Sequence, residues 1–186
     1  QRIELSGNLF DEFQGGGANS ASVSFSRGDL SGFGVLPSMI GDYSIFNYSL
    51  SRQQAITEKL SLYVSARGQL TDGLSSGPGQ EDYLDSAENF SLGGLYGVRA
   101  YPSGEATGAQ GQLVSLEFRY LLNTSLILKP HYDWGKVEKR NLSSGGPSAY
   151  EVSGAGLGIS WSAPMEFNVQ APFSRRIGSN PNPQPS

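Results

Sequence analysis

The sequence has no cysteine, a single histidine and no long apolar run, and each absence excludes a class of protein or site. Without cysteine, the chain can hold no disulfide scaffold, no thiolate zinc site and no catalytic thiol. No apolar run approaches the roughly 20 residues that a transmembrane helix needs. The 13 Lys and Arg against 17 Asp and Glu give a net charge of −4. This acidic balance argues against a nucleic-acid-binding protein, because such proteins present basic surfaces to phosphates.

Glycine and aromatic residues are abundant. The chain has 25 Gly in 186 residues, about twice the usual share of roughly 7%, together with nine Tyr, nine Phe and two Trp. Aromatic residues favour strands, and glycine is disfavoured inside helices. The composition therefore predicts strands and loops, and the length fits one domain.

Apolar and polar residues alternate in eight segments, which is the pattern of strands with one apolar and one polar face. The segments lie near residues 3–9, 20–26, 43–50, 59–67, 114–120, 126–134, 154–161 and 165–173. Because a soluble antiparallel sandwich has the same period, alternation alone does not place the chain in a membrane.

The lengths of the connections between these segments distinguish a membrane barrel from a soluble sandwich better than the alternation does. Short connections near 11–17, 51–57, 122–124 and 162–164 alternate with long ones near 28–42, 71–111, 136–148 and 174–186. Transmembrane β-barrels have this asymmetry, with short periplasmic turns and long extracellular loops. We therefore predict an all-β fold, a transmembrane antiparallel β-barrel. A secreted β-sandwich adhesin or lectin is the alternative from another class.

The connection 71–111 is too long for an ordinary hairpin, and loops of such length usually have a function. An eight-stranded barrel is filled by its own side chains and has no room for this loop. If the loop lies in the lumen, the complete barrel must have more strands than these eight. We therefore expect residues 1–186 to be a fragment of a larger barrel.

Two motifs resemble those of the two-partner secretion transporters, the outer-membrane proteins that export haemolysins and filamentous adhesins. The V/I-R-G-Y/F loop motif appears as Val98-Arg99-Ala100-Tyr101, with Ala in place of Gly. A P-x-G-E-A-x-G run follows with Gly104 and Glu105, and the glycines Gly93 and Gly94 precede the motif. The F-x-D-x-G motif is matched by Asp133 and Gly135, with His131 where Phe is usual.

The resemblance implies a fold, a location and a function. The chain would be the C-terminal part of a sixteen-stranded barrel of the bacterial outer membrane, with loop 71–111 in the lumen or outside the cell. The front half of the barrel and the periplasmic POTRA domains would lie outside it. The function implied is translocation of a partner polypeptide, with membrane lipid as the other partner. Because the sequence shows no nucleotide-binding or metal motif and is acidic, we predict no nucleic acid, nucleotide, metal or cofactor.

Within the family, the loop arginine pairs with the aspartate of the second motif, so the resemblance implies a salt bridge between Arg99 and Asp133. Alternation independently places Asp133 on the polar, lumenal face with Glu117 and Arg119. A guanidinium can engage a carboxylate through two parallel hydrogen bonds, which fixes orientation as well as position.

Other functions have weaker sequence support. An assembly factor that inserts other barrels would share the loop arginine and the aspartate.

Three kinds of ligand or catalytic site have little support. A nucleotide site at the stretch GGLYG is not supported, because the stretch lacks the Lys and Ser/Thr of a phosphate-binding loop. A hydrolase would need His131 with Asp133 and either Ser115 or Ser125, and we predict no catalytic residues. The acidic residues Glu81, Asp82, Asp85 and Glu88 lack the spacing of an EF-hand calcium site.

Overall fold

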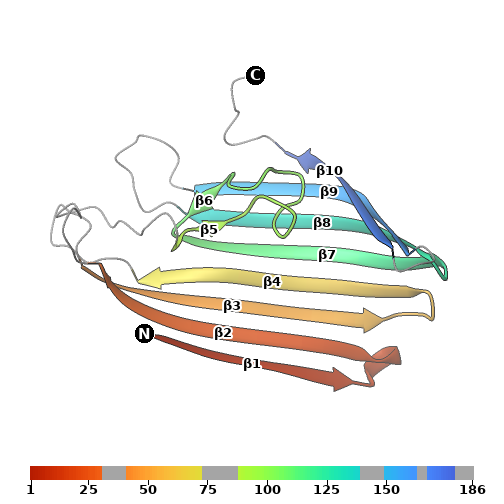
Figure 1. The fold of residues 1–186 in the computed structure, drawn as a ribbon, viewed down its shortest axis with the longest axis horizontal. Helices are drawn as coiled ribbons and strands as arrows, with labels where there is room; N and C mark the ends of the chain where they lie inside the picture. The colour runs from red at the N-terminus through yellow and green to blue at the C-terminus, as the bar shows by residue number, and fades with distance from the viewer. Residues whose placement is uncertain (31–40, 73–87, 139–148, 163–166, 179–186) are drawn as a thin grey trace.

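The chain forms a large curved antiparallel sheet of eight strands and a separate sheet of two short strands. The computed structural model describes residues 1–30, 41–72, 88–138, 149–162 and 167–178 (Figure 1). Eight strands pair in the order β1-β2-β3-β4-β7-β8-β9-β10, so β1 and β10 are the two edges of the large sheet. The strands are β1 (Arg2–Asp11), β2 (Gly17–Leu30), β3 (Gly41–Ala55), β4 (Leu60–Asp72), β7 (Gln110–Asn123), β8 (Leu126–Glu138), β9 (Ala149–Ser162) and β10 (Asn168–Ile177).

The predicted all-β fold is confirmed, and each of the eight alternating segments corresponds to one strand. The strands are longer than the alternation indicated, mostly at the ends that adjoin the long connections. The last segment, predicted over 165–173, is observed as β10 over Asn168–Ile177, and 165–166 lie outside the described residues. Within the described ranges, no helix is long and apolar enough to cross a membrane.

The two faces of the sheet differ in polarity. Cross-strand pairing puts Ser65, Ser115 and Asp133 in one row on the inner face, while Leu116 pairs with Tyr132 on the outer face. Large apolar side chains on the outer face are exposed, for example 73% for Ile3. A β-sandwich would bury such a face against a second sheet, but no layer covers it in the described part of the chain (Figure 1). The sandwich alternative is therefore not the fold observed.

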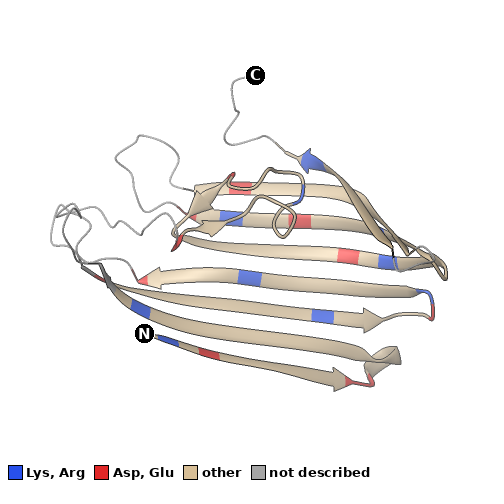
Figure 2. Ribbon diagram, viewed as in Figure 1, with Lys and Arg blue, Asp and Glu red and all other residues tan. Residues whose placement is uncertain are grey.

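Polar groups bound this apolar outer face at both ends of the strands. Near the short connections, the Arg52 guanidinium donates to both carboxylate oxygens of Asp11 at 2.7 and 3.0 Å, and Asn19 donates to the same carboxylate at 2.8 Å. Near the long connections, the Trp134 indole N–H donates to Glu151 at 2.8 Å. Along the strands, Figure 2 shows neighbouring charged residues on β1 and on β7, which are the inner-face pairs Arg2–Glu4 and Arg119–Glu117.

The strand ends that adjoin the short connections lie at one end of the sheet, and the strand ends that adjoin the long connections lie at the other (Figure 1). The short ones include 12–16, which contains the 3-10 turn η1 (Phe13–Gly15), and 124–125 between β7 and β8. The first part of the long connection between β4 and β7, residues 73–87, lies outside the described residues. The rest forms a hairpin on the inner face.

This separation predicts which residues can be reached from outside the cell. A single cysteine at Glu138, at the end with the long connections, is expected to react with a membrane-impermeant maleimide on whole cells, whereas one at Thr124 should react only after the outer membrane is opened. Both positions are tested in a cysteine-free full-length background. Labelling of Thr124→Cys on intact cells, with Glu138→Cys silent, would reverse the orientation.

Candidate functional site

Residues 88–108 form a compact hairpin. Strand β5 (Phe90–Ser91) pairs with β6 (Thr107–Gly108), and the chain between them reverses at a tip formed by residues 94–97. Gly94 has a φ of +103°, a conformation that side chains disfavour. At Gly93 a Cβ atom would overlap the Pro102 carbonyl. These two glycines, which precede the loop motif in the sequence, therefore permit the tight fold of the hairpin.

The hairpin packs against the inner face of β7, β8 and β9 through an apolar cluster. Leu92 and Val98 are fully buried, and Tyr101 is 3% exposed. The cluster comprises Phe90, Leu92, Val98, Tyr101, Leu113, Val137, Tyr150 and Val152. Gly135 makes room for it, because a Cβ there would overlap the Leu92 side chain.

The motif arginine lies directly on the motif aspartate. Arg99 donates from Nε and from one terminal nitrogen to the two oxygens of Asp133, at 2.9 and 3.0 Å, and its backbone N–H donates to the same carboxylate at 3.1 Å. Asp133 is 1% exposed. The structure thus brings together two residues that the sequence separates by 34 positions, in the two-bond geometry that suits a guanidinium and a carboxylate.

Glu117 is a second acidic partner of Arg99. The remaining terminal nitrogen of Arg99 donates to Glu117 at 2.6 Å, and Arg119 donates to the other oxygen of Glu117 at 2.9 Å. Burial acts to lower the pKa of Arg99, but its hydrogen bonds to Asp133 and Glu117 outweigh this and leave the pKa raised. The arginine is therefore charged at every physiological pH, and two carboxylates share its charge.

Strand β10 supplies a second attachment for the hairpin. Arg176 lies 3.5 Å from the Glu105 carboxylate, donates to the Ala100 carbonyl at 3.4 Å, and stacks over the Tyr101 ring at 4.6 Å. Glu105 thus faces the wall, whereas Gly104 has a φ of +84° in an open turn. The sequence motifs did not point to Arg176, because it lies outside both of them.

Ala100 stands where the family motif has Gly, and the wall compensates for its methyl group. Gly154 lies opposite, and a Cβ there would be 2.5 Å from the Ala100 Cβ. Two methyl groups cannot occupy that space, so one of the two positions must be Gly.

We therefore expect Gly154→Ala to destabilise the docked hairpin by about 1–3 kcal/mol, the usual cost of overpacking. Ala100→Gly in the same chain should restore most of that loss. Protease resistance of the hairpin in the full-length barrel measures both. Failure of the second substitution to rescue the first would mean that Gly154 is needed for another reason, such as its approach to the Arg175 carbonyl at 3.2 Å.

The hydrolase arrangement considered from the sequence is not formed. His131 Nε2 bonds to the Ser174 hydroxyl at 2.8 Å and Nδ1 to the Lys129 carbonyl at 3.2 Å, not to Ser115 or Ser125. Both oxygens of Asp133 accept hydrogen bonds from Arg99. Both ring nitrogens of His131 therefore have partners other than Asp133. The described residues contain no cluster of three potential metal ligands.

Comparison with known proteins agrees with this fold. No family model matches the chain. It is 26% identical over 148 residues to the heme/hemopexin transporter protein HuxB of Haemophilus influenzae strain Rd, which is 75% of this chain and 25% of HuxB. HuxB of another strain is 25% identical over 146 residues. The chain therefore spans about a quarter of the length of these curated relatives.

A solved structure has a similar fold. CdiB from Escherichia coli matches with a TM-score of 0.66 and 19% sequence identity, over 95% of this chain and 33% of CdiB. The sequence relatives support a location in the bacterial outer membrane. By fold, by sequence relationship and by location, this chain is similar to the outer-membrane transporters of two-partner secretion.

Proposed function

We propose that the chain is part of an outer-membrane pore that translocates a partner polypeptide to the cell surface. Residues 1–186 would form the C-terminal part of the barrel, with further strands and the POTRA domains supplied by the rest of the protein. The two edges of the sheet support this arrangement. In a membrane, the unpaired backbone groups of β1 and β10 need neighbouring strands, because lipid cannot bond to them.

The docked hairpin is the observation that carries the proposal. It lies on the polar inner face and is held there by Arg99 through Asp133 and Glu117. A barrel built only for stability has no need of a long loop inside its lumen. We propose that Val98, Arg99, Ala100 and Tyr101 hold the hairpin in a secretion-competent position, with Asp133 and Gly135 as their partners on the wall and Gly93, Gly94, Gly104 and Glu105 shaping the loop.

The inner wall suits passage of an extended chain. Its central row across β2, β3, β4 and β7 contains Ser20, Ser51, Ser65 and Ser115. Hydroxyl groups can bond to a passing backbone without offering an apolar pocket that would trap it. The proposed activity is conduction, with no catalytic residue and no cofactor in the pore.

The proposal is tested with the full-length protein in its source bacterium. Deleting the gene should remove one or a few large polypeptides from the cell surface and the medium, as measured by quantitative proteomics. Re-expression should restore them, and the purified protein should conduct ions in a planar bilayer. Loss of many unrelated outer-membrane barrels from the deletion strain would instead indicate an assembly factor.

A further inference from the structure

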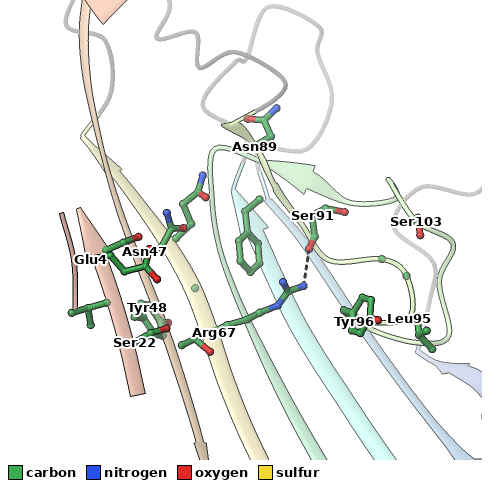
Figure 3. A pocket seen from close by; sticks show the side chains of 18 of the residues that line it. Glu4, Ser22, Asn47, Tyr48, Arg67, Asn89, Ser91, Leu95, Tyr96 and Ser103 are labelled. Carbon is green, nitrogen blue, oxygen red and sulfur yellow. Dashed lines mark hydrogen bonds between the residues drawn. The ribbon is translucent and has the colours of Figure 1, made fainter. Parts of the chain in front are cut away.

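We infer that the inner face beside Arg67 is a binding site for carboxylate groups on the polypeptide in transit, an inference that rests on the proposed function. A cavity of about 550 Å³ lies between the hairpin and the inner face of the strands from β1 to β4. Figure 3 shows Arg67 reaching from the wall toward Ser91 of the hairpin, with Ser22 and Asn47 across the cavity. The volume falls in the range of roughly 300–1,000 Å³ that is typical of ligand sites.

Arg67 differs from the two arginines near Asp133 in having no acidic partner among the described residues. Arg99 and Arg119 each form an ion pair with Glu117, whereas Arg67 forms none with any residue that the structure describes. One terminal nitrogen lies 3.5 Å from the Ser91 carbonyl, at the limit of a hydrogen bond. Its Nε is buried and has no hydrogen-bond partner among the described residues.

Among the described residues, the wall around Arg67 offers no carboxylate that is free to pair with it. Across the strands, Arg67 pairs with Ser49, which pairs with Ser22, and Gln69 in the next row pairs with Asn47. The described inner-face side chains of β2, β3 and β4 include no Asp or Glu. On β1, Glu4 is already paired with Arg2 at 2.9 Å.

A positive charge in this position favours an anionic ligand. Withdrawing a guanidinium from water without a partner is costly, and a carboxylate offsets the cost because it fits the planar fork. Phe90 holds the guanidinium carbon 5.3 Å from its ring centre, which limits the orientations of the group. The surrounding hydroxyl and amide groups can bond to the backbone that carries the carboxylate. Because a conducting path requires weak binding, we expect rapid exchange.

The test uses the full-length protein in detergent micelles and a fluorescent synthetic peptide of alternating serine and aspartate. Fluorescence anisotropy should show binding that becomes about tenfold weaker in R67Q, the loss expected for a hydrogen-bonded charge. S49D should weaken binding similarly while leaving Arg67 in place, because it puts a carboxylate directly opposite the arginine. R27Q on the outer face and S160D on the inner face of β9 are controls for net charge and should bind as the wild type does.

Equal binding of this peptide by the wild type and R67Q overturns the inference. So does equal binding of a peptide with asparagine in place of aspartate, because the site would then not recognise charge. Measuring export of the partner polypeptide by cells distinguishes a failure of this inference from a failure of the proposed function. We expect S49D to slow export of the partner polypeptide relative to S160D. Normal export by S49D would reject the role in transit while leaving the pore function standing, whereas absence of export by the wild type would reject the pore itself.

Discussion

Arg99→Ala is expected to free the hairpin from the wall and to impair export severely while the barrel still inserts. The substitution leaves Asp133 buried without its partner, and breaking a buried ion pair in this way costs about 3–5 kcal/mol. Asp133→Ala should have a similar effect, because Arg99 would retain only Glu117. Arg99→Lys should restore little, since an ammonium group cannot make both hydrogen bonds to Asp133 and a third to Glu117. Protease cleavage within the hairpin and secretion of the partner polypeptide are the two measurements.

The double variant shows whether the two residues act through one contact. Arg99→Ala combined with Asp133→Ala should be less damaging than the sum of the single changes, with a coupling free energy of about 0.5–3 kcal/mol. Arg2→Ala is a matched control, because its ion pair with Glu4 is exposed and contributes little. Strictly additive effects of the two substitutions on hairpin protection would contradict the pairing as the functional contact.

Leu116→Arg is expected to prevent assembly of the barrel in the membrane. Leu116 lies on the outer face near the middle of β7, where an arginine would enter hydrocarbon at a cost of about 2–4 kcal/mol. Ser65→Arg is the matched control. It lies in the neighbouring cross-strand row but on the inner face, where the lumen is wet. Heat-modifiable migration on gels and the amount of folded barrel in the outer membrane measure both variants.

The assignment of the faces depends on the contrast between these variants. If Leu116→Arg assembled as well as Ser65→Arg, the outer face would not contact lipid. A defect in Ser65→Arg alone would mean that the faces are reversed.

The sequence predicted the strands and the contact between the two motifs from different kinds of signal. Alternation located the eight strands because each has one wet and one apolar face, as Leu116 and Ser115 illustrate. It also put Asp133 on the inner face. The pairing with Arg99 came from the family resemblance, because alternation along a strand does not show which loop residue contacts that strand. Glu117 lies on the same inner face, and its pairing with Arg99 emerges only from the three-dimensional position of the guanidinium.

The docking surface for the hairpin was missed for a physical reason. Tyr150 and Val152 are apolar and face inward, whereas further along β9 Leu157 and Trp161 are apolar and face outward. The polarity of the strand therefore changes phase where the hairpin covers the inner wall. A search that assumes one apolar face along the whole strand cannot find this change. A strand whose apolar residues switch from one face to the other therefore indicates that part of its inner face is covered.

The charged groups at the two ends of the outer face determine the bilayer thickness that the protein matches. The Arg52–Asp11 pair bounds the apolar surface at one end, and Glu151 bounds it at the other. In a thicker membrane these groups would be drawn among acyl chains, at a cost of fractions of a kcal/mol for each Å of mismatch. The distance between these two ends of the outer face therefore sets the hydrocarbon thickness that the sheet matches.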